Sequence, residues 1–359
     1  MSFKKVTIRD VAKEANVSTA TVSRALNMTG PVKQNTLNTI IRAAEKLGYA
    51  YKPTIDSTQD ASSAKLLQSV PVFPNQKEQN IILVNIPNMS NPFYSKIIDG
   101  IHASAESRFL SVVFSSVEIN DLNVDSFIQL MKRLKVIGII ILNNIPPTAL
   151  MHLTSYVPVV QCCEYYDNPY ASYVGINDYT STEIAINYYH SMGREKIGFI
   201  NGPMEFKYSQ NRLAAYKSIM ANLGIDIPSS WIIQLPELNH DIAFTSIVQV
   251  LSSPNPPDCF FAVSDVLAAA AIKAAQYCNL QVPSDIMVIG FDNTDISQLA
   301  TPSITTIKQP CYQLGFLACE LLFEKIENPA SKVKQMKLPT ELIIRESTAI
   351  EKSAALRAL

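Results

Sequence analysis

The sequence lacks the features that mark membrane and secreted proteins. No stretch reaches the roughly 18 uninterrupted apolar residues that a membrane-spanning helix needs. The beginning of the chain carries no apolar core of the length found in signal peptides. We therefore expect a cytoplasmic protein with no membrane attachment.

The spacings of a disulfide framework or a metal site are also missing. The six cysteines contain no C-x-x-C pair, two of them (Cys162 and Cys163) are adjacent, and no histidine stands at metal-ligand spacing. Buried, reduced thiols are the default for cysteines of this kind inside the cell. We predict neither a metal nor a cofactor.

Catalytic motifs are absent as well. The chain has no P-loop, no G-x-G-x-x-G turn and no Ser/His/Asp arrangement, and its four histidines are scattered (His102, His152, His190 and His240). Such motifs are the usual sequence evidence for an enzyme. We predict no catalytic residues and a protein that is not an enzyme. The alternative, an enzyme acting on nucleosides, would be tested by looking for turnover.

The chain is long, and its charge is unevenly divided. With 359 residues, 47% of them hydrophobic, it can build two or three compact units. Residues 1–53 hold nine Lys or Arg against three acidic residues, a net +6, which leaves −7 for the rest of a chain whose net charge is −1. A basic segment on an otherwise acidic chain indicates contact with a polyanion.

Three short helices are expected in the basic segment. Thr7 and Asp10 resemble a capping box, and apolar residues follow at helical spacing as far as Ala15. A third helix has its apolar face between residues 37 and 47, and Gly48 would end it.

The second helix is suited to reading DNA. Ser18 can cap it. A three-residue turn between two short helices is typical of a helix-turn-helix unit, whose second helix enters the major groove. Small side chains permit close approach to base edges, and an arginine can reach a guanine or a phosphate. The outward face of this helix holds such residues: Thr19, Ala20, Ser23 and Arg24. A solvated helical bundle with an ordinary polar face is the alternative.

Residues 7–27, TIRDVAKEANVSTATVSRALN, closely resemble the start of the lactose-repressor (LacI/GalR) family of transcriptional regulators. The resemblance implies that Thr19 and Ala20 read bases, that Arg24 stands at the family's arginine, and that the partner is a double-stranded DNA operator bound in a salt-dependent way. The DNA-binding residues implied in this segment are Thr7, Ser18, Thr19, Ala20, Thr21, Ser23, Arg24 and Asn27.

Residues 54–79 form a polar, proline-containing hinge or linker. In the family this region carries a hinge helix whose leucine wedges into the minor groove. The nearest match here, residues 61–67, lacks the family's arginine, and it makes Leu66 or its neighbour Leu67 the candidate wedge. Simple packing of the linker is the alternative. A weakened hinge would favour help from a second DNA-bound protein.

Beyond residue 80, short β-rich runs alternate with amphipathic segments, as in repeated βαβ units. Residues 80–350 are too many for one parallel sheet, so we expect two doubly wound lobes. The ligand cleft should lie between them, at the carboxyl ends of the strands. The expected strands are Ile81–Ile86, Ser111–Ser115, Val136–Leu142, Val157–Cys162, Ile197–Ile200, Cys259–Val263 and Ile286–Phe291.

Side chains near the ends of these strands are candidate effector ligands. Phe93 and Tyr94 can stack on a ring. Arg212 can donate a fork of hydrogen bonds, and Asp292 can accept from vicinal hydroxyls. Asp265 also follows a strand. For each of these residues a core or helix-capping role is the alternative.

The family resemblance extends over nearly the whole chain, through SNPFY at 90–94, SD at 264–265, GFDN at 290–293, TTIKQP at 305–310 and ELIIREST at 341–348. It implies that Arg212 and Asp292 bind a sugar or ribose hydroxyl group. The positions that would read the rest of the effector hold Phe206, Tyr208, Cys162 and Cys163.

Residues 17–26, 290–299 and 341–348 look most like nucleoside-responsive members of the family. This implies a nucleoside such as cytidine as inducer, control of genes for nucleoside uptake and catabolism, and cooperation on DNA with the cyclic-AMP receptor protein. A purine- or sugar-responsive repressor stays open, as does co-repression.

The expected fold is an all-α helix-turn-helix (lambda-repressor-like) domain at 1–53 and an α/β periplasmic-binding-protein-like domain at 80–350, followed by a tail at 351–359. Lobe 1 would cover about 80–177 and 310–335, and lobe 2 about 178–309 and 336–350. A homodimer would place two recognition helices on a palindromic site. A periplasmic sugar-binding protein of the same two-lobed fold is disfavoured by the missing secretion signal and the basic helix-turn-helix.

Overall fold

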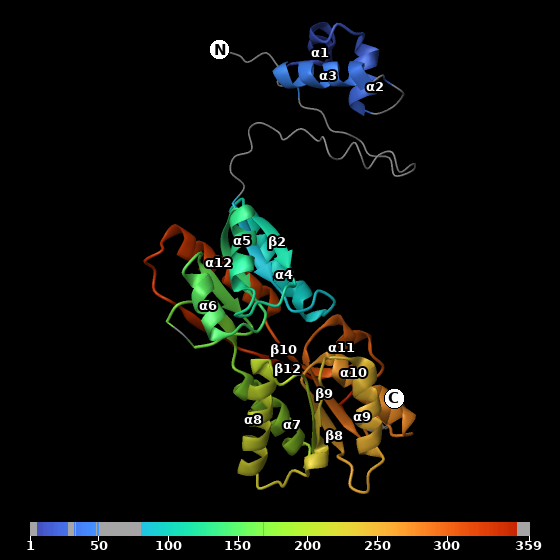
Figure 1. Cartoon of the computed structure of the whole chain (residues 1–359). Coiled ribbons are helices and arrows are strands. Elements are labelled where there is room, and N and C mark those ends of the chain that lie inside the picture. Colours follow the sequence, from blue (N-terminus) through green and yellow to red (C-terminus); the bar gives the residue numbers. More distant parts are fainter. Residues whose placement is uncertain are drawn as a thin grey trace, which may run out of the picture. The chain divides into compact units, whose positions relative to one another are not determined.

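The computed structural model of the protein describes residues 6–27, 32, 34–47, 49, 80–167 and 169–349. It divides the chain into two compact units, Met1–Gln76 and Lys77–Leu359 (Figure 1). The linker at 54–79 with the candidate wedge Leu66 or Leu67, the helix stop Gly48 and the tail at 351–359 lie outside the described residues.

The described part of the first unit contains three short helices. The carboxylate of Asp10 accepts hydrogen bonds from the N–H of Thr7 at 2.8 Å and from its hydroxyl at 2.7 Å, which is the expected capping of the first helix. Buried apolar side chains from all three helices form one core, and Val11, Val22 and Ile40 are its fully buried members. The helices are α1 (Ile8–Glu14), α2 (Thr19–Asn27) and α3 (Gln34–Leu47), as a helix-turn-helix unit requires.

Lobe 1 of the second unit is a parallel sheet with the strand order β11-β5-β4-β3-β1-β2. Its strands are β1 (Ile81–Asn85), β2 (Ser111–Ser115), β3 (Val136–Ile141), β4 (Val159–Cys162), β5 (Ser172–Ile176) and β11 (Gln335–Leu338). Its helices are α4 (Phe93–Ser107), α5 (Val124–Arg133), α6 (Pro147–Thr154) and α12 (Cys311–Glu327).

Helices cover both faces of this sheet. Successive residues of a strand point to opposite faces. Ile82, Val84 and Ile140 therefore join one core with α4 and α12, while Leu83 and Ile139 join another with α5 and α6. Burial on both faces explains why these strands are nearly continuous apolar runs.

Lobe 2 repeats this architecture with the order β12-β10-β9-β8-β6-β7, parallel except for the edge strand β12. Its strands are β6 (Ile197–Asn201), β7 (Ile232–Gln234), β8 (Cys259–Ala262), β9 (Met287–Asp292), β10 (Thr305–Lys308) and β12 (Glu341–Ile343). Its helices are α7 (Asp178–Ser191), α8 (Lys207–Asn222), α9 (His240–Leu251), α10 (Asp265–Tyr277) and α11 (Asp295–Leu299), with a 3-10 turn at Ser229–Trp231. The expected pair of doubly wound lobes is confirmed.

The chain passes between the lobes three times, after β5, after β10 and after β11. The third crossing differs from the sequence prediction. Strand β11 pairs with β5 in lobe 1, so that lobe continues to Leu338 and not to residue 335. The short, alternating QMKL segment of β11 gave no apolar run from which its sheet could be assigned.

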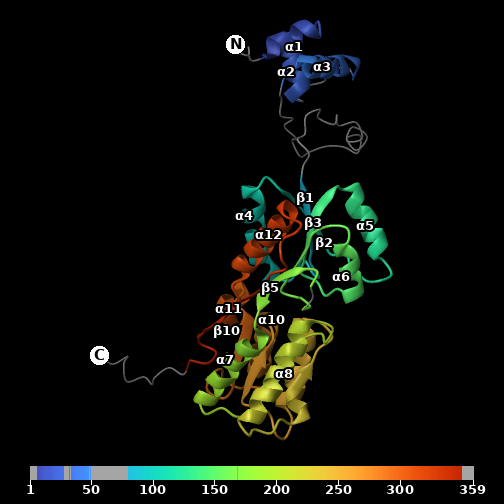
Figure 2. The same ribbon diagram turned by 90° about the vertical axis from the view of Figure 1, so that its left-hand side faces the viewer.

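Helices α4 and α12 run side by side in lobe 1 (Figures 1 and 2). A Cβ atom added at Gly100 would lie 2.1 Å from the carbonyl oxygen of Tyr312, and one added at Gly315 would lie 2.0 Å from that of Ile97. The two backbones can approach this closely only because both positions are glycine.

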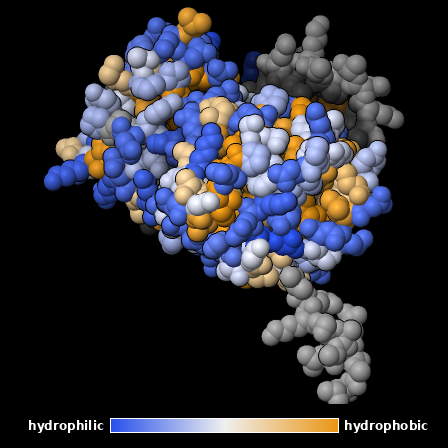
Figure 3. All heavy atoms as spheres, turned by 90° about the horizontal axis from the view of Figure 1, so that it is seen from below, coloured by the Kyte–Doolittle hydropathy of each residue, from blue (hydrophilic) through white to orange (hydrophobic). Residues whose placement is uncertain are grey.

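The surface seen from below in Figure 3 mixes hydrophilic residues with smaller apolar patches. Within the described ranges, no helix has the length and apolar character needed to cross a bilayer.

Candidate functional site

A cavity of about 620 Å³ lies between the two lobes, at the carboxyl ends of their strands. Pro87 follows β1, Cys163 follows β4 and Asp178 follows β5 in lobe 1. From lobe 2, Val263 follows β8 and Asp292 ends β9. This is where a ligand is expected in open α/β sheets, and the volume lies within the usual range for small-molecule sites.

Six of the seven residues expected at the effector site line this cavity: Phe93, Tyr94, Phe206, Tyr208, Arg212 and Asp292. Two aromatic pairs come from opposite lobes. The rings of Phe93 and Tyr94 meet edge to face with centroids 5.1 Å apart, and those of Phe206 and Tyr208 lie 5.7 Å apart at an interplanar angle of 23°. The cavity therefore presents aromatic surface from both lobes.

Arg212, on α8, is held in a fixed orientation. Its Nε donates to Asp178 at 2.9 Å, and its Nη1 donates to the carbonyl oxygen of Val263 at 2.9 Å. Its guanidinium carbon stacks 3.4 Å from the ring centroid of Phe291. Only 4% of the residue is exposed, so contacts within the protein fix the position of this cation.

Asp292 is the last residue of β9. Its backbone has φ 102°, which an L residue rarely adopts, and Gln309 Nε2 donates to its carboxylate at 2.7 Å. Burial raises the pKa of Asp292 to about 7, against the opposing effect of the Arg212 guanidinium. The carboxyl can therefore titrate near neutral pH. Its unusual backbone angle is a second feature, because strained backbone is concentrated at binding sites.

Asp265 does not reach the cavity, in contrast to the sequence expectation. Its carboxylate accepts hydrogen bonds from Thr294 N at 2.7 Å, from Thr294 Oγ1 at 2.9 Å and from Thr306 Oγ1 at 2.6 Å. It is 1% exposed, and burial raises its pKa to about 6. Asp265 thus joins β10 to the segment that follows β9, behind the cavity wall.

Of the two adjacent cysteines, Cys163 lines the cavity and Cys162 is buried in the core.

Glu164 was not expected at the site. This buried carboxyl lines the cavity and accepts hydrogen bonds from the backbone N–H groups of Lys207 at 2.8 Å and Tyr208 at 3.4 Å. Burial raises its pKa to about 7, with the two backbone N–H groups acting in the opposite direction. Glu164 follows an expected strand, so the end-of-strand rule could have found it. Asp178 and Gln309 also line the cavity and were not predicted at the site.

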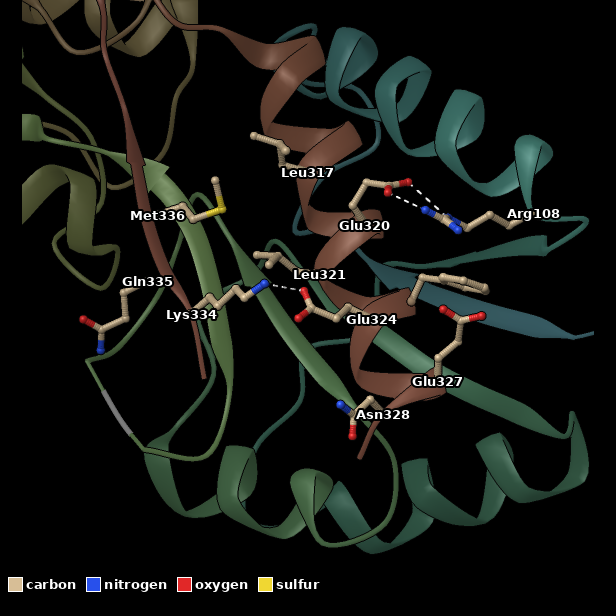
Figure 4. Close-up of a pocket in the computed structure, with 11 residues that line it drawn as sticks. Arg108, Leu317, Glu320, Leu321, Glu324, Glu327, Asn328, Lys334, Gln335 and Met336 are labelled. Atoms are coloured by element: carbon tan, nitrogen blue, oxygen red, sulfur yellow. Dashed lines mark hydrogen bonds and ion pairs between the residues drawn. The ribbon is translucent and has the colours of Figure 1, made fainter. Parts of the chain in front are cut away.

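A second cavity, of about 710 Å³, lies on lobe 1 beside α12 (Figure 4). Its charged side chains largely satisfy one another, because Arg108 pairs with Glu320 and Lys334 pairs with Glu324. The larger volume alone does not make it the better site. The interlobe cavity collects aromatic rings, a fixed cation and titratable carboxyls at strand ends.

In the first unit, α2 carries the residues expected to read DNA. Ser18 Oγ accepts from the N–H of Thr21 at 3.1 Å and thereby caps α2. Thr19, Ala20 and Arg24 are exposed, with Arg24 Nε donating to the carbonyl oxygen of Ala20 at 3.3 Å. Thr7 and Ser18 are also exposed, Thr21 and Ser23 are half-buried, and the side chain of Asn27 lies outside the described residues.

Known families match both units of the chain. Residues 7–51 match the model for bacterial regulatory proteins of the lacI family, and residues 186–348 match the periplasmic binding protein-like domain. The chain is 31% identical over 344 residues to the HTH-type transcriptional repressor CytR of Escherichia coli K12, covering 95% of this chain and 96% of that protein.

Two further relatives and one solved structure extend the comparison. The ribose operon repressor of Halalkalibacterium halodurans is 28% identical, with 95% of this chain and 97% of that protein covered. The repressor PurR of Photobacterium profundum is 26% identical, with 95% and 98% covered. The crystal structure of the lac repressor dimer bound to operator and the anti-inducer ONPF has the same fold. It is 24% identical, with a TM-score of 0.69 and with 96% and 100% covered.

Proposed function

This chain belongs to the lacI family of bacterial regulatory proteins and is a DNA-binding transcriptional repressor, not an enzyme, and we propose that its interlobe cavity binds a nucleoside such as cytidine as inducer. In this proposal, the inducer releases the repressor from operators of genes for nucleoside uptake and catabolism.

One observation carries the choice of a nucleoside. The same cavity holds aromatic side chains, among them Phe206 and Tyr208, and two groups whose chemistry suits hydroxyls, Arg212 and Asp292. A nucleoside offers a flat base for the rings and vicinal ribose hydroxyls for the carboxylate and the guanidinium. A pentose lacks the flat base, and a free purine lacks the ribose. The similarity to CytR supports the same choice.

A matched ligand series tests this proposal. We expect cytidine to raise the thermal unfolding midpoint of the protein more than cytosine or ribose at equal concentration. A ligand that binds only the folded state stabilises it by about 2.7 kcal/mol at a hundred times its Kd. The same screen should include the other ribonucleosides, hypoxanthine and guanine. A response to ribose alone or to a free purine alone would contradict the proposal and favour a sugar- or purine-responsive repressor.

For DNA binding, we propose that the exposed face of α2 contacts bases in a major groove. Two copies of the chain would bind the two half-sites of a palindromic operator as a homodimer. The similarity of residues 7–51 to the lacI family supports this, as does the exposure of Thr19, Ala20 and Arg24. Analytical ultracentrifugation should give the mass of two chains. Fluorescence anisotropy with an operator duplex should show weaker binding when cytidine is added.

Cooperation with the cyclic-AMP receptor protein belongs to the same proposal. If the hinge contributes little to operator binding, a second DNA-bound protein would supply the missing free energy. Anisotropy measured with and without that protein on a duplex carrying both sites should show a lower Kd for the repressor when both are present. Equal Kd values would contradict the cooperation.

A further inference from the structure

We propose that Glu164 is a positioning residue of the effector cavity, a carboxyl of lobe 1 that holds the first turn of α8 in lobe 2 and thereby fixes the aromatic wall formed by Phe206 and Tyr208. The effector's identity rests on the function proposed above. The positioning role itself rests only on contacts within the described second unit.

The contact between Glu164 and α8 joins the two lobes. Glu164 stands two residues beyond β4 of lobe 1, and it accepts from Lys207 N at 2.8 Å and Tyr208 N at 3.4 Å, the first two residues of α8. The first N–H groups of a helix have no partner within the helix, and a negative charge near them is favourable. Both oxygens of the carboxylate are used, one for each N–H group.

Two neighbouring contacts hold the same segment against lobe 1. Lys207 Nζ donates to the carbonyl oxygen of Tyr165 at 2.8 Å and lies 4.0 Å from the centroid of the Tyr165 ring. Asn144 Nδ2 donates to the carbonyl oxygen of Glu205 at 2.8 Å. Residues 205–208 are thus bound at four points to lobe 1, and the carboxylate of Glu164 provides two of them.

The held segment carries part of the cavity wall. Phe206 and Tyr208 stand on either side of Lys207 in the sequence, and both rings line the cavity. Moving the first turn of α8 away from lobe 1 would move these rings with it. Glu164 therefore couples the approach of the lobes to the placement of the surface on which a base would stack.

Charged and titratable groups face Glu164 from several elements. Asp178 and Arg212 act on it with opposite sign, and Tyr94, Tyr208 and Cys163 adjoin it in the cavity. No side-chain ion pair to Glu164 is found in the part of the chain that the structure describes. The hydrogen bonds of its carboxylate are to the N–H groups of α8, as a positioning role requires.

Hydrogen–deuterium exchange on the full-length protein without ligand tests the contact directly. In Glu164→Ala the N–H groups of Lys207 and Tyr208 lose their acceptor. We expect the peptide spanning 204–210 to exchange at least about tenfold faster, because protection follows the local opening equilibrium. Glu164→Gln keeps one carbonyl acceptor of the same length but places an NH2 donor opposite the other N–H group, so its exchange should lie between that of the wild type and that of Glu164→Ala. Glu195→Ala, which removes an exposed carboxylate elsewhere in lobe 2, is the matched control and should change nothing in this peptide.

Unchanged protection of 204–210 in Glu164→Ala would overturn the proposal, and so would faster exchange spread evenly over lobe 2, since that indicates general loosening. If the alanine variant does not fold, Glu164→Asp replaces it. The shorter side chain cannot reach both N–H groups, and the same local increase is expected.

Titration with cytidine as the probe adds the second readout. We expect Glu164→Ala to weaken cytidine binding about tenfold and Glu164→Gln to restore it to within about threefold of the wild type. Equal affinity of wild type and Glu164→Ala would overturn the coupling to the cavity. If the wild type itself binds no nucleoside, the proposed function fails, while the exchange experiment still decides whether Glu164 holds α8.

Discussion

Arg24 is exposed on α2, and its Nε donates to the carbonyl oxygen of Ala20. The guanidinium ends in further donors that can make a paired contact to guanine. We predict that Arg24→Ala weakens binding to a palindromic site, selected by the wild type from random duplexes, by about 1–3 kcal/mol. Anisotropy titrations at fixed salt measure this. Equal loss on random DNA would indicate a phosphate contact instead, and no loss would remove Arg24 from the reading face.

A second prediction at the residue scale concerns Asp292 in the interlobe cavity. Its carboxylate lines the cavity, held by Gln309 and facing Arg212. Asp292→Ala removes the carboxylate that we propose as the acceptor for ribose hydroxyls, and it leaves α2 unchanged. We predict that operator binding is retained while cytidine no longer weakens it, as seen in a reporter assay with and without cytidine. Normal induction in the variant would show that Asp292 does not bind the inducer.

The contrast between Asp292, Asp265 and Glu164 shows what sequence reasoning can predict at this scale. Asp292 ends a strand and the other two carboxyls follow strands, so the end-of-strand rule places all three near the cleft. It does not say which way a side chain turns. Asp265 turns to Thr294 and Thr306, whereas Glu164 turns to α8. That choice depends on partners from distant parts of the chain, which the sequence pattern does not identify.

Between elements, the tightest constraint in lobe 1 is the crossing of α4 and α12. A Cβ at position 100 would lie 2.1 Å from a backbone oxygen of α12, so the helices must separate to admit it. We predict that Gly100→Ala lowers the stability of the second unit by about 1–3 kcal/mol or more, the range for overpacked cores. Differential scanning calorimetry measures this. Glu106→Ala, at an exposed position of the same helix, is the control. Equal midpoints for wild type and Gly100→Ala would show that the crossing tolerates a methyl group.

The elements were predictable where a strand is an apolar run. Strands β1, β2 and β3 lie within a residue of their expected bounds. For β1 and β3 the reason is burial on both faces, which selects consecutive apolar side chains. Strand β5 was missed although it is buried, and so were the short strands β7, β10 and β12. Strand β11 lies at a sheet edge and alternates between exposed and half-buried residues. Its partner β5 lies some 160 residues earlier in the sequence, and no local sequence pattern indicates a strand pairing over such a separation.

For the molecule as a whole, the buried carboxyls predict how stability depends on pH. Burial raises the pKa of Glu164 and Asp292 to about 7 and that of Asp265 to about 6, all above their ordinary values near 4. The folded state then binds protons more tightly than the unfolded state. These groups therefore cost stability as the pH rises from about 4 to about 7 and change little above that.

We predict that the thermal unfolding midpoint of the second unit decreases as the pH is raised from 5.5 to 8. The decrease should be smaller in the double variant Glu164→Gln/Asp292→Asn. Calorimetry at matched ionic strength measures both. Glu195→Gln, which removes an exposed carboxylate, should follow the wild type. A double variant with the full wild-type slope would mean that other groups dominate the titration.

The three crossings between the lobes also determine the order in which a growing polypeptide can fold. Synthesis proceeds at roughly 5–20 residues per second, and amino-terminal domains form first. The DNA reader is complete once α3, which ends at Leu47, has left the ribosome. Neither lobe can finish its sheet until β11 and β12, at residues 335–343, have emerged. A chain cut short by premature termination would thus carry a complete DNA-binding domain without a complete two-lobed domain.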